Sequence, residues 1–377
     1  MAVWLCALEG VGGLKRFSKE YYKGRNVFIT GHTGFKGAWL CEMLEKAGAN
    51  VTGYALEPPT KPSLFELAGI GKNIHTITGD VRCLDDLKAA FEAARPEIVF
   101  HLAAQPIVRE SYRDPVRTYE TNVMGTVNIL ECIRTSDCVR SFLNVTTDKV
   151  YLNREWAWGY RENEELNGYD PYSNSKSCSE LVTGAYQRSF FQDGRVAIST
   201  ARAGNVIGGG DFAKDRIIPD CVRAAARGED IIVRDPYSVR PYQHVLEPLF
   251  VYLMIAAGQM EDHSLAGCYN VGPDDADCFR TGALAELFTQ QWGDGLRWTD
   301  QYDGGPHEAK FLKLDCSKLK ATFGWSPRWD LKTAVQMVVE WSKCWLSGGD
   351  VRSCMDSQIE AFLQTPERGE GHHALEK

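Results

Sequence analysis

A tyrosine and a lysine stand four positions apart in the segment Tyr172-Ser173-Asn174-Ser175-Lys176. Positions i and i+4 of a helix lie on one face, so the phenol and the ammonium are predicted to be neighbours. A nearby positive charge is expected to lower the phenol pKa from about 10 towards neutrality. Tyr172 could then accept a proton from a hydroxyl group as hydride leaves the same carbon. This spacing is very common, so the prediction depends on the segments around it.

A hydroxyl, a carboxylate and an ammonium follow one another in Thr147-Asp148-Lys149, just after the apolar run 142–145. Such a run is typical of a buried strand. The three groups could exchange protons with a substrate held at the end of that strand. The alternative interpretation is an exposed ion pair at the start of a solvated loop.

A glycine-rich turn indicates where a phosphate could bind. The turn follows the predicted strand 26–30, precedes the predicted helix 38–49, and consists of Gly31, His32, Thr33, Gly34, Phe35, Lys36 and Gly37. Glycines let a diphosphate approach the backbone, and the helix N-terminus supplies free N–H groups. A dinucleotide site is therefore predicted, the alternative being a turn without a ligand.

Two acidic residues lie where strands are expected to end. Glu57 comes late for binding an adenosine ribose after the predicted strand 50–54, so the choice between NAD and NADP is weakly specified. Asp80, which ends the predicted strand 74–80, could accept a hydrogen bond from the adenine amino group. It could equally belong to a helix N-cap region, and the two roles are compatible.

Strands and helices alternate through the first half of the chain. Apolar strands separated by amphipathic helices predict an α/β fold with a Rossmann-type, doubly wound parallel sheet and a smaller C-terminal substrate-binding lobe. The further strands are expected at 97–104, 141–145 and 196–201, and the further helices at 84–96, 119–134 and 172–191. The predicted division assigns residues 1–203 and 241–270 to the nucleotide-binding domain, 204–240 and 271–363 to the lobe, and 364–377 to a mobile tail.

Composition excludes several classes of protein. The 377 residues carry a net charge of -8, which argues against a nucleic-acid binder, although a few local arginines could still hold a phosphate. The twelve cysteines include no C-x-x-C pair, residues 1–11 lack a secretory signal, and the apolar run 249–257 is too short for a membrane span. A cytoplasmic protein with free thiols is expected, and its eight dispersed histidines predict no metal site.

The glycine turn, the Tyr172–Lys176 pair and the strand end at Thr147 resemble those of the extended short-chain dehydrogenase/reductases. The resemblance extends from residue 23 to about residue 346. The resemblance implies NAD(P) binding at the glycine turn and a catalytic set of Thr147, Tyr172 and Lys176, with Asn122 orienting the lysine. It also implies cofactor contacts from the ends of the third and fourth strands, at Asp80, Val81, Leu102, Ala103 and Ala104.

The pair Asp148-Lys149 narrows the resemblance to the sugar-nucleotide 4,6-dehydratases that act on CDP-glucose, whereas those acting on dTDP-glucose have Asp-Glu. Six further segments are similar to the same enzymes: GHTGFKGAW, HLAAQPIVRESY, DPYSNSKSCSELV, RAGNVIGGGDF, RPYQHVLEPL and HEAKFLKLD. The implied reaction is NAD-dependent oxidation at C4, loss of water across C5 and C6, and return of the hydride to C6. Asp148 would protonate the leaving hydroxyl, and Lys149 would remove the C5 proton or instead stabilise the enolate electrostatically.

The substrate pocket is predicted around six polar residues, which could alternatively form structural ion pairs: Gln105, Arg202, Asn205, Arg216, Arg240 and His307. Glu308 and His244 are weaker candidates, Trp325 and Trp329 are expected in the core, and recognition of the base is not specified. Alternative functions are another dehydratase or a 4-epimerase of this fold, and less plausibly a non-catalytic NAD-binding regulator. The apolar spacing of Cys178, Leu181, Val182 and Ala185 would suit a dimer or a tetramer, although burial within one chain would give the same pattern. The product implied by the resemblance would supply deoxysugars for surface polysaccharides such as lipopolysaccharide O-antigen.

Overall fold

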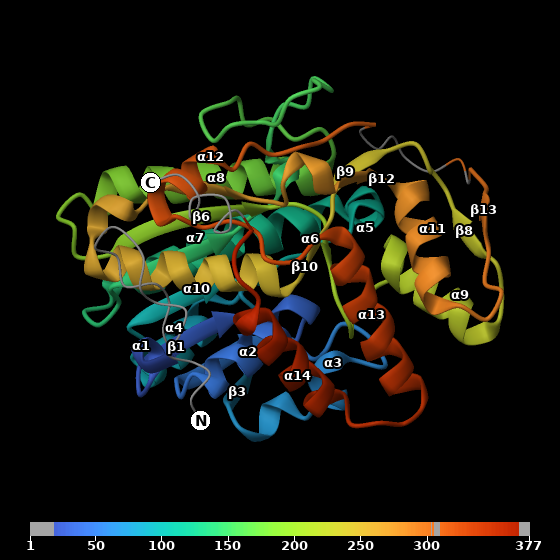
Figure 1. Cartoon of the computed structure of the whole chain (residues 1–377). Helices are drawn as coiled ribbons and strands as arrows, with labels where there is room; N and C mark the ends of the chain where they lie inside the picture. Colours follow the sequence, from blue (N-terminus) through green and yellow to red (C-terminus); the bar gives the residue numbers. More distant parts are fainter. Residues whose placement is uncertain (1–18, 303, 305–309, 369–377) are drawn as a thin grey trace, which may run out of the picture.

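The computed structural model describes residues 19–302, 304 and 310–368. A seven-stranded sheet lies at its centre, with the order β11-β6-β5-β4-β1-β2-β3 (Figure 1). Every neighbouring pair of strands in this sheet is parallel. Its strands are β1 (Asn26–Thr30), β2 (Asn50–Ala55), β3 (His75–Thr78), β4 (Ile98–His101), β5 (Ser141–Val145), β6 (Ala197–Ala203) and β11 (Cys268–Val271).

Helices cover both faces of this sheet, as burial of the apolar strands on two sides requires. One face packs against α4, α7 and α8, and the other packs against α2 and α10 (Figure 1). This arrangement confirms the predicted doubly wound Rossmann-type fold. The helices are α2 (Phe35–Lys46), α4 (Leu84–Ala94), α7 (Gly125–Thr135), α8 (Pro171–Phe190) and α10 (Leu246–Glu261).

Helix α10 contains the longest apolar run of the chain. Ten consecutive residues, Pro248 to Ala257, are buried within it, which is the position expected of a core helix. Among the described residues, no helix is both long and apolar enough to cross a bilayer. In the same part of the chain, no three His, Cys, Asp or Glu side chains are grouped so that they could hold a metal ion.

The lobe lies to the right of the sheet in Figure 1 and has its own hydrophobic cluster. Three two-stranded sheets contribute to it, pairing β7 with β10, β8 with β13 and β9 with β12. Its elements are β7 (Val206–Ile207), α9 (Ile217–Arg227), β8 (Ile231–Val233), β9 (Val239–Pro241), β10 (Gln243–His244), β12 (Cys278–Arg280), α11 (Thr281–Trp292), β13 (Trp298–Asp300) and α13 (Leu331–Leu346).

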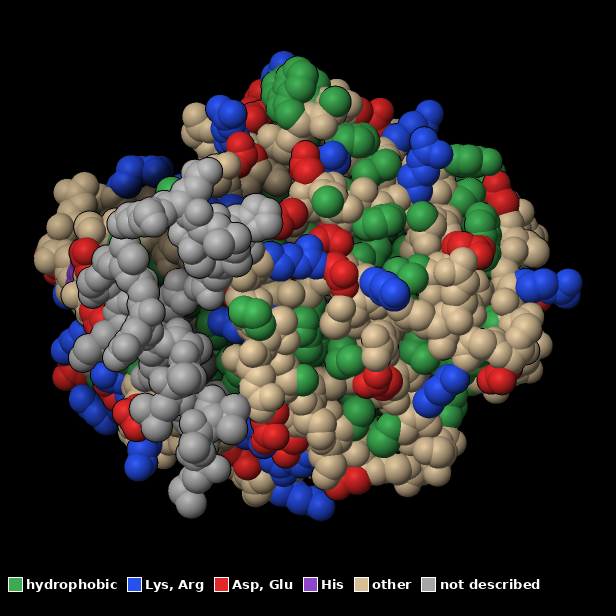
Figure 2. Space-filling model, in the orientation of Figure 1, with side chains coloured by type: hydrophobic (Ala, Val, Ile, Leu, Met, Phe, Trp, Pro, Cys, Tyr) green, Lys and Arg blue, Asp and Glu red, His purple; other side chains and the backbone are tan. Residues whose placement is uncertain are grey.

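The remaining elements connect or flank these layers. They are α1 (Lys19–Tyr22), α3 (Leu64–Leu67), α5 (Val108–Arg113), α6 (Pro115–Tyr119), the π-helical turn Glu120–Met124, α12 (Ser317–Phe323), α14 (Val351–Gln364) and the 3-10 turns Ile70–Lys72, Asp148–Val150, His263–Leu265 and Asp275–Asp277. Acidic and basic side chains are interspersed over the face seen in Figure 2.

The predicted domain boundaries stay a prediction, but two packing contacts bear on them. Strand β11 joins the main sheet beside β6, as the inclusion of 241–270 anticipates. Helix α14 lies against both α2, where Arg352 Nη2 is 3.0 Å from Glu42 Oε2, and α13 of the lobe, where Gln358 Nε2 donates to Met337 O at 2.8 Å. The predicted mobile tail begins too early, because Glu367 is buried and Arg368 forms ion pairs, and residues 369–377 lie outside the described residues.

Candidate active site

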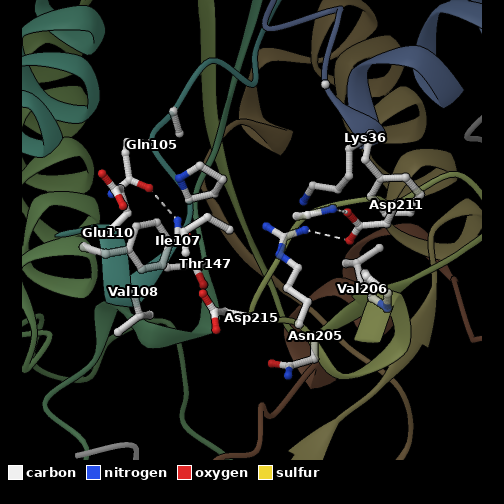
Figure 3. Close-up of a pocket in the computed structure, with 18 of the residues that line it drawn as sticks. Lys36, Gln105, Ile107, Val108, Glu110, Thr147, Asn205, Val206, Asp211 and Asp215 are labelled. Carbon is white, nitrogen blue, oxygen red and sulfur yellow. Dashed lines mark hydrogen bonds and ion pairs between the residues drawn. The ribbon is translucent and has the colours of Figure 1, made fainter. Parts of the chain in front are cut away.

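One large cleft, with a volume of about 1530 Å³, separates the sheet from the lobe. It opens at the carboxyl ends of the parallel strands, where ligands bind in open α/β sheets. Figure 3 shows Lys36 and Asp211 on one side of this cleft and Gln105 and Thr147 on the other.

The glycine turn between β1 and α2 lines the cleft and fits a dinucleotide diphosphate. Gly31 has a φ of 79°, and a Cβ there would lie 2.7 Å from Ala103 N. A Cβ on Gly37 would lie 2.2 Å from Gly31 O, so the turn can be this tight only with glycines. Beside Gly34 only Gly31 O would come within 4 Å, which leaves its backbone open towards the cleft.

Not every residue of this turn presents its side chain to the cleft. Thr33, Phe35 and Lys36 line it, whereas His32 is fully buried with its ring 5.3 Å from that of Phe65. Burial lowers the pKa of His32 to about 4. The predicted contact of His32 with a cofactor is thus restricted to its backbone.

The residues predicted to bind the adenosine part of the dinucleotide also lie along the cleft. Asp80, Val81 and Glu57 line it. The Asp80 carboxylate accepts hydrogen bonds from Arg82 Nε at 2.9 Å and Nη2 at 2.6 Å, which holds its pKa below the ordinary value. Asp80 therefore lines the cleft with a cationic partner already in place, and its contact with an adenine stays a prediction.

The end of β4 contributes the segment Leu102 to Gln105 to the cleft wall. Asn122 is buried behind it, accepting from Gln105 N at 2.8 Å and donating to Ser175 Oγ at 2.8 Å. Asn122 therefore contacts α8 beside Lys176 rather than the lysine itself. The side chain of Gln105 is also engaged within the protein, with Thr118 Oγ1 and with the backbone of Ile107 (Figure 3).

Tyr172 and Lys176 lie at the start of α8, which Asp170 caps through Ser173 N and which begins with Pro171. Proline at the first helical position and an aspartate cap are strong N-terminal signals, so this start is locally encoded. Tyr172 lines the cleft. Lys176 is buried next to the cleft floor, where Nζ donates to Val145 O at 3.0 Å.

The ionisation of this pair differs from the expectation. Burial raises the pKa of Tyr172 to about 12, although a hydrogen bond with Thr147 and the charge of Arg216 oppose the increase. Burial also lowers the pKa of Lys176 to about 8, against the effect of Glu180. The prediction that Lys176 brings the phenol towards neutrality is wrong for the protein without a ligand, because desolvation outweighs the hydrogen bond with Thr147 and the charge of Arg216, which are the effects that lower the pKa.

Thr147, Asp148 and Lys149 all line the cleft at the end of β5. Asp148 is 1% exposed and accepts from Thr147 Oγ1 at 2.9 Å, while Lys149 Nζ lies 3.6 Å from Asp148 Oδ1. Its second oxygen, Oδ2, is buried without a hydrogen-bond partner among the described residues. An exposed ion pair is therefore the wrong interpretation of this segment, and a buried oxygen available for a proton is what the structure contains.

Three of the predicted substrate residues line the lobe side of the cleft: Asn205, Arg216 and Arg240. Asn205 Oδ1 lies 3.5 Å from Lys149 Nζ, which joins this side to the strand end. Arg216 Nη1 donates to Asp211 Oδ2 at 2.9 Å. Each guanidinium could present paired N–H donors to a phosphate.

Arg202 does not belong to this group. Its side chain is 2% exposed, lies outside the cleft lining and forms a bidentate pair with Glu180. Because Arg202 is on β6, strand alternation points it into the protein rather than towards the lobe. The predicted role of Arg202 in the substrate pocket is replaced by the alternative, a structural ion pair.

The remaining candidates do not extend the site. His307 and Glu308 lie outside the described residues. His244 is buried between Trp39 and Trp329, away from the cleft lining. Trp325 and Trp329 are buried, as expected for core residues.

Sequence reasoning missed several charged residues of the lobe side. Asp211 and Asp215 line the cleft, and Asp215 Oδ1 is 2.8 Å from Arg234 Nη1. Arg109, from α5, also reaches Asp215 at 3.9 Å. The signal for Asp211 and Asp215 was present in the segment GGGDFAKDR, where acidic and basic residues alternate after three glycines.

Comparison with known proteins agrees with this geometry. A family described as GDP-mannose 4,6 dehydratase matches residues 28–338. The chain belongs to this family. Among similar proteins, CDP-glucose 4,6-dehydratase of Salmonella typhimurium is 46% identical to this chain over 356 residues. The match covers 93% of this chain and 99% of the relative.

More distant relatives share the fold and much of the length. dTDP-glucose 4,6-dehydratase of Haemophilus influenzae is 24% identical, over 70% of this chain and 80% of the relative. Among solved structures, the dTDP-glucose 4,6-dehydratase of Bacillus anthracis in complex with NAD has a TM-score of 0.70 at 20% identity, covering 85% of this chain and 97% of that one. The family's Rossmann-type architecture is thus confirmed for the chain.

Proposed function

We propose that the chain is an NAD-dependent CDP-glucose 4,6-dehydratase, a lyase that converts CDP-D-glucose to CDP-4-dehydro-6-deoxy-D-glucose and water. The observation that carries this proposal is the Asp148-Lys149 pair, which lies beside Thr147 and Tyr172 inside the cleft. A 4-epimerase needs the hydroxyl and the tyrosine but has no use for an added acid and base. The 46% identity to the Salmonella typhimurium enzyme supports CDP-glucose as the substrate.

The residues around the glycine turn would hold NAD, which when bound would accept a hydride from the sugar and later return it. Tyr172 accepts the proton of the C4 hydroxyl, which requires its pKa to fall from about 12. A positive charge placed beside the phenol by the bound cofactor acts in that direction. Thr147 shares a hydrogen bond with the phenol and stabilises the oxygen at C4.

Dehydration then follows from the chemistry of a 4-keto sugar, whose C5 proton is acidic. Asp148 presents its unpartnered Oδ2 to the C6 hydroxyl and donates the proton with which water leaves. Lys149 removes the C5 proton and returns a proton to C5 when the hydride reaches C6. Alternatively, its ammonium stabilises the enolate while Asp148 or a water carries these protons. Lys149 Nζ lies between Asp148 and Asn205, so it can reach a sugar held at this end of the cleft.

The lobe side binds the sugar nucleotide in this proposal. Arg216 and Arg240 pair with the diphosphate oxygens, for which the guanidinium geometry is suited. Asn205 contacts the diphosphate or ribose. The diphosphate would compete with Asp211 for Arg216, exchanging one carboxylate contact for two phosphate contacts.

The protein is tested by incubation with CDP-glucose and, separately, with dTDP-glucose, UDP-glucose and GDP-mannose. We expect CDP-glucose alone to lose one water, detected by mass, with the alkaline absorbance of a 4-keto-6-deoxy sugar and without net accumulation of NADH. Isomerisation without loss of water would establish an epimerase and remove the roles given to Asp148 and Lys149. Absence of turnover with every sugar nucleotide and added NAD would favour a binding protein.

We also propose a homodimer formed through α8. Leu181 is 56% exposed in the middle of this helix, Ala185 one turn later is also exposed, and Cys178 and Val182 are half-buried. Apolar side chains exposed together on a helical face are typical of an interface. Light scattering of the purified protein should give twice the chain mass, and a monomer mass would exclude this pairing.

A further inference from the structure

A buried ion pair lies directly behind the cleft. Glu180 is 4% exposed and Arg202 is 2% exposed. Arg202 Nε donates to Glu180 Oε1 at 3.0 Å, and Arg202 Nη2 donates to Oε2 at 2.9 Å. This bidentate geometry fixes the plane of the carboxylate as well as its distance.

Two hydroxyl groups complete the surroundings of Glu180. Thr146 Oγ1 donates to Oε1 at 2.5 Å, and Thr200 Oγ1 donates to Oε2 at 2.8 Å. Each carboxylate oxygen therefore accepts one bond from the arginine and one from a threonine. A buried carboxylate with its acceptor sites filled in this way has little freedom to move.

This network is attached to the strand that carries the acid–base residues. Glu180 follows Lys176 by four positions and Tyr172 by eight on α8, so the three side chains lie along one face of the helix. Lys176 binds Val145 O at 3.0 Å, and Glu180 binds the next residue, Thr146. The last residue of β5 and the residue that follows it are thus held by α8 just before Thr147.

The arginine extends the same network to the segment that follows Lys149. Arg202 Nη1 donates to Tyr151 Oη at 2.9 Å and to Glu162 O at 2.9 Å. Tyr151 Oη in turn donates to Asn270 Oδ1 at 2.6 Å. The residues before and after the Thr147–Lys149 segment are therefore tied to one buried centre.

We propose that Glu180, clamped by Arg202, is a positioning residue that sets the end of β5 against the Tyr172–Lys176 face of α8. The proposal rests on the function proposed above, because it assigns Glu180 to that reaction. The Glu180 carboxylate also acts on Lys176 electrostatically, raising its pKa against the effect of burial. The other charged or titratable groups that couple to Lys176 are Lys36 of α2 and His101 of β4, while Tyr172 precedes it by one turn of α8.

The first test is the variant Glu180→Gln, with Glu247→Gln as its matched control. Glu247 is 1% exposed and accepts two backbone N–H groups, but it lies outside the cleft lining. We expect Glu180→Gln to lower kcat about 100-fold with KM within about threefold, since small misplacement of reacting groups has effects of this size. Glu247→Gln should keep kcat and KM within about twofold, as expected of a site with no shared partners.

A second readout does not depend on turnover. The protein is labelled with ¹³C at lysine Cε, and the NMR resonance of Lys176 is identified by its absence from the spectrum of Lys176→Met. The chemical shift of this resonance as a function of pH gives the titration of Lys176. We expect this titration to move to lower pH in Glu180→Gln and to stay in place in Glu247→Gln, because only the first variant removes a carboxylate that supports the ammonium. If Glu180 had a purely structural role, Glu180→Gln would lower stability without moving the titration of Lys176.

The variant Thr146→Val keeps the fold testable if Glu180→Gln does not fold. It removes one hydroxyl contact with Glu180, and we expect kcat to fall about tenfold at little changed KM, as loss of one hydrogen bond to a charged group would give. The proposal is overturned if Thr146→Val keeps wild-type kcat, or if folded Glu180→Gln keeps wild-type kcat and Lys176 titration. Failure of wild-type protein to turn over CDP-glucose would instead overturn the proposed function, while the Lys176 titration would still be measurable.

Discussion

The two sides of the cleft hold their charged groups in different ways. On the sheet side, Lys176, Glu180 and Arg202 are each less than 5% exposed, and hydrogen bonds fix all three. On the lobe side, the side chain of Arg216 is 34% exposed and its ion pair is with a carboxylate that also faces the cleft, Asp211. The sheet side is therefore pre-organised, and the lobe side has contacts that a ligand can exchange.

This difference suits the two tasks of a sugar-nucleotide enzyme. Acid–base groups act efficiently when their positions are set before the substrate arrives. A guanidinium that is already paired can exchange its carboxylate for a phosphate, and the exchange leaves it paired at every stage. The buried charges of Lys176, Glu180 and Arg202 have no such replacement partner. Removal of one of them should therefore have much larger effects on stability and kcat.

The largest effect is expected for Tyr172→Phe. Loss of the proton acceptor should lower kcat about 10³-fold while the protein still binds CDP-glucose, a size typical of general acid–base groups. Tyr269→Phe is the matched control, because its buried hydroxyl donates to Leu265 O away from the cleft. A Tyr172→Phe enzyme with more than a tenth of wild-type kcat would show that another group accepts the proton.

Arg202→Met should reduce the free energy of unfolding by about 3–5 kcal/mol, since it leaves the carboxylate of Glu180 buried without its counter-charge. Arg216→Met, the same substitution on the lobe side, should cost less, on the order of 1–2 kcal/mol, because Arg216 is 34% exposed and Asp211, although 5% exposed, keeps its hydrogen bond from Ala213 N. Urea unfolding of both variants measures the contrast. Equal losses would remove the distinction between the two sides.

Glu247 offers a buried carboxylate without a bidentate arginine. Burial raises its pKa from 4.5 to about 7, so the folded state binds its proton more tightly than the unfolded state does. Its contribution to stability is present below pH 4.5 and is lost as pH rises through 7, by on the order of 3 kcal/mol.

Glu247→Gln cannot titrate, so wild-type stability relative to this variant should fall between pH 4.5 and 7. Unfolding curves of the two proteins across that range measure the difference. A constant difference would mean that the carboxylate titrates normally.

The smallest of these effects is expected on the lobe side of the cleft. Arg216→Met should raise the KM for CDP-glucose about tenfold, with kcat nearly unchanged, the effect of losing one charge-assisted contact. Asp211→Asn should act in the opposite direction, because Arg216 then has no carboxylate to give up. A fall in kcat without a change in KM for Arg216→Met would place this arginine with the acid–base residues instead.

Local sequence signals predicted the sheet, the glycine turn and the start of α8, because each depends on neighbouring residues. The position of Arg202 depends instead on which way β6 faces and on a carboxylate 22 residues away, and neither was visible in the sequence. The pKa of Tyr172 was predicted in the wrong direction for a similar reason. Residue spacing shows the lysine, whereas the depth of burial that outweighs it comes from tertiary packing.

The central claim is that one active site oxidises C4, removes water and returns the same hydrogen to C6. The most direct measurement uses CDP-glucose deuterated at C4, with the position of the label in the product determined by NMR. The account predicts a product that has lost water and carries the deuterium at C6 of the same molecule. Deuterium that remains at C4, or that is lost to solvent, would contradict it.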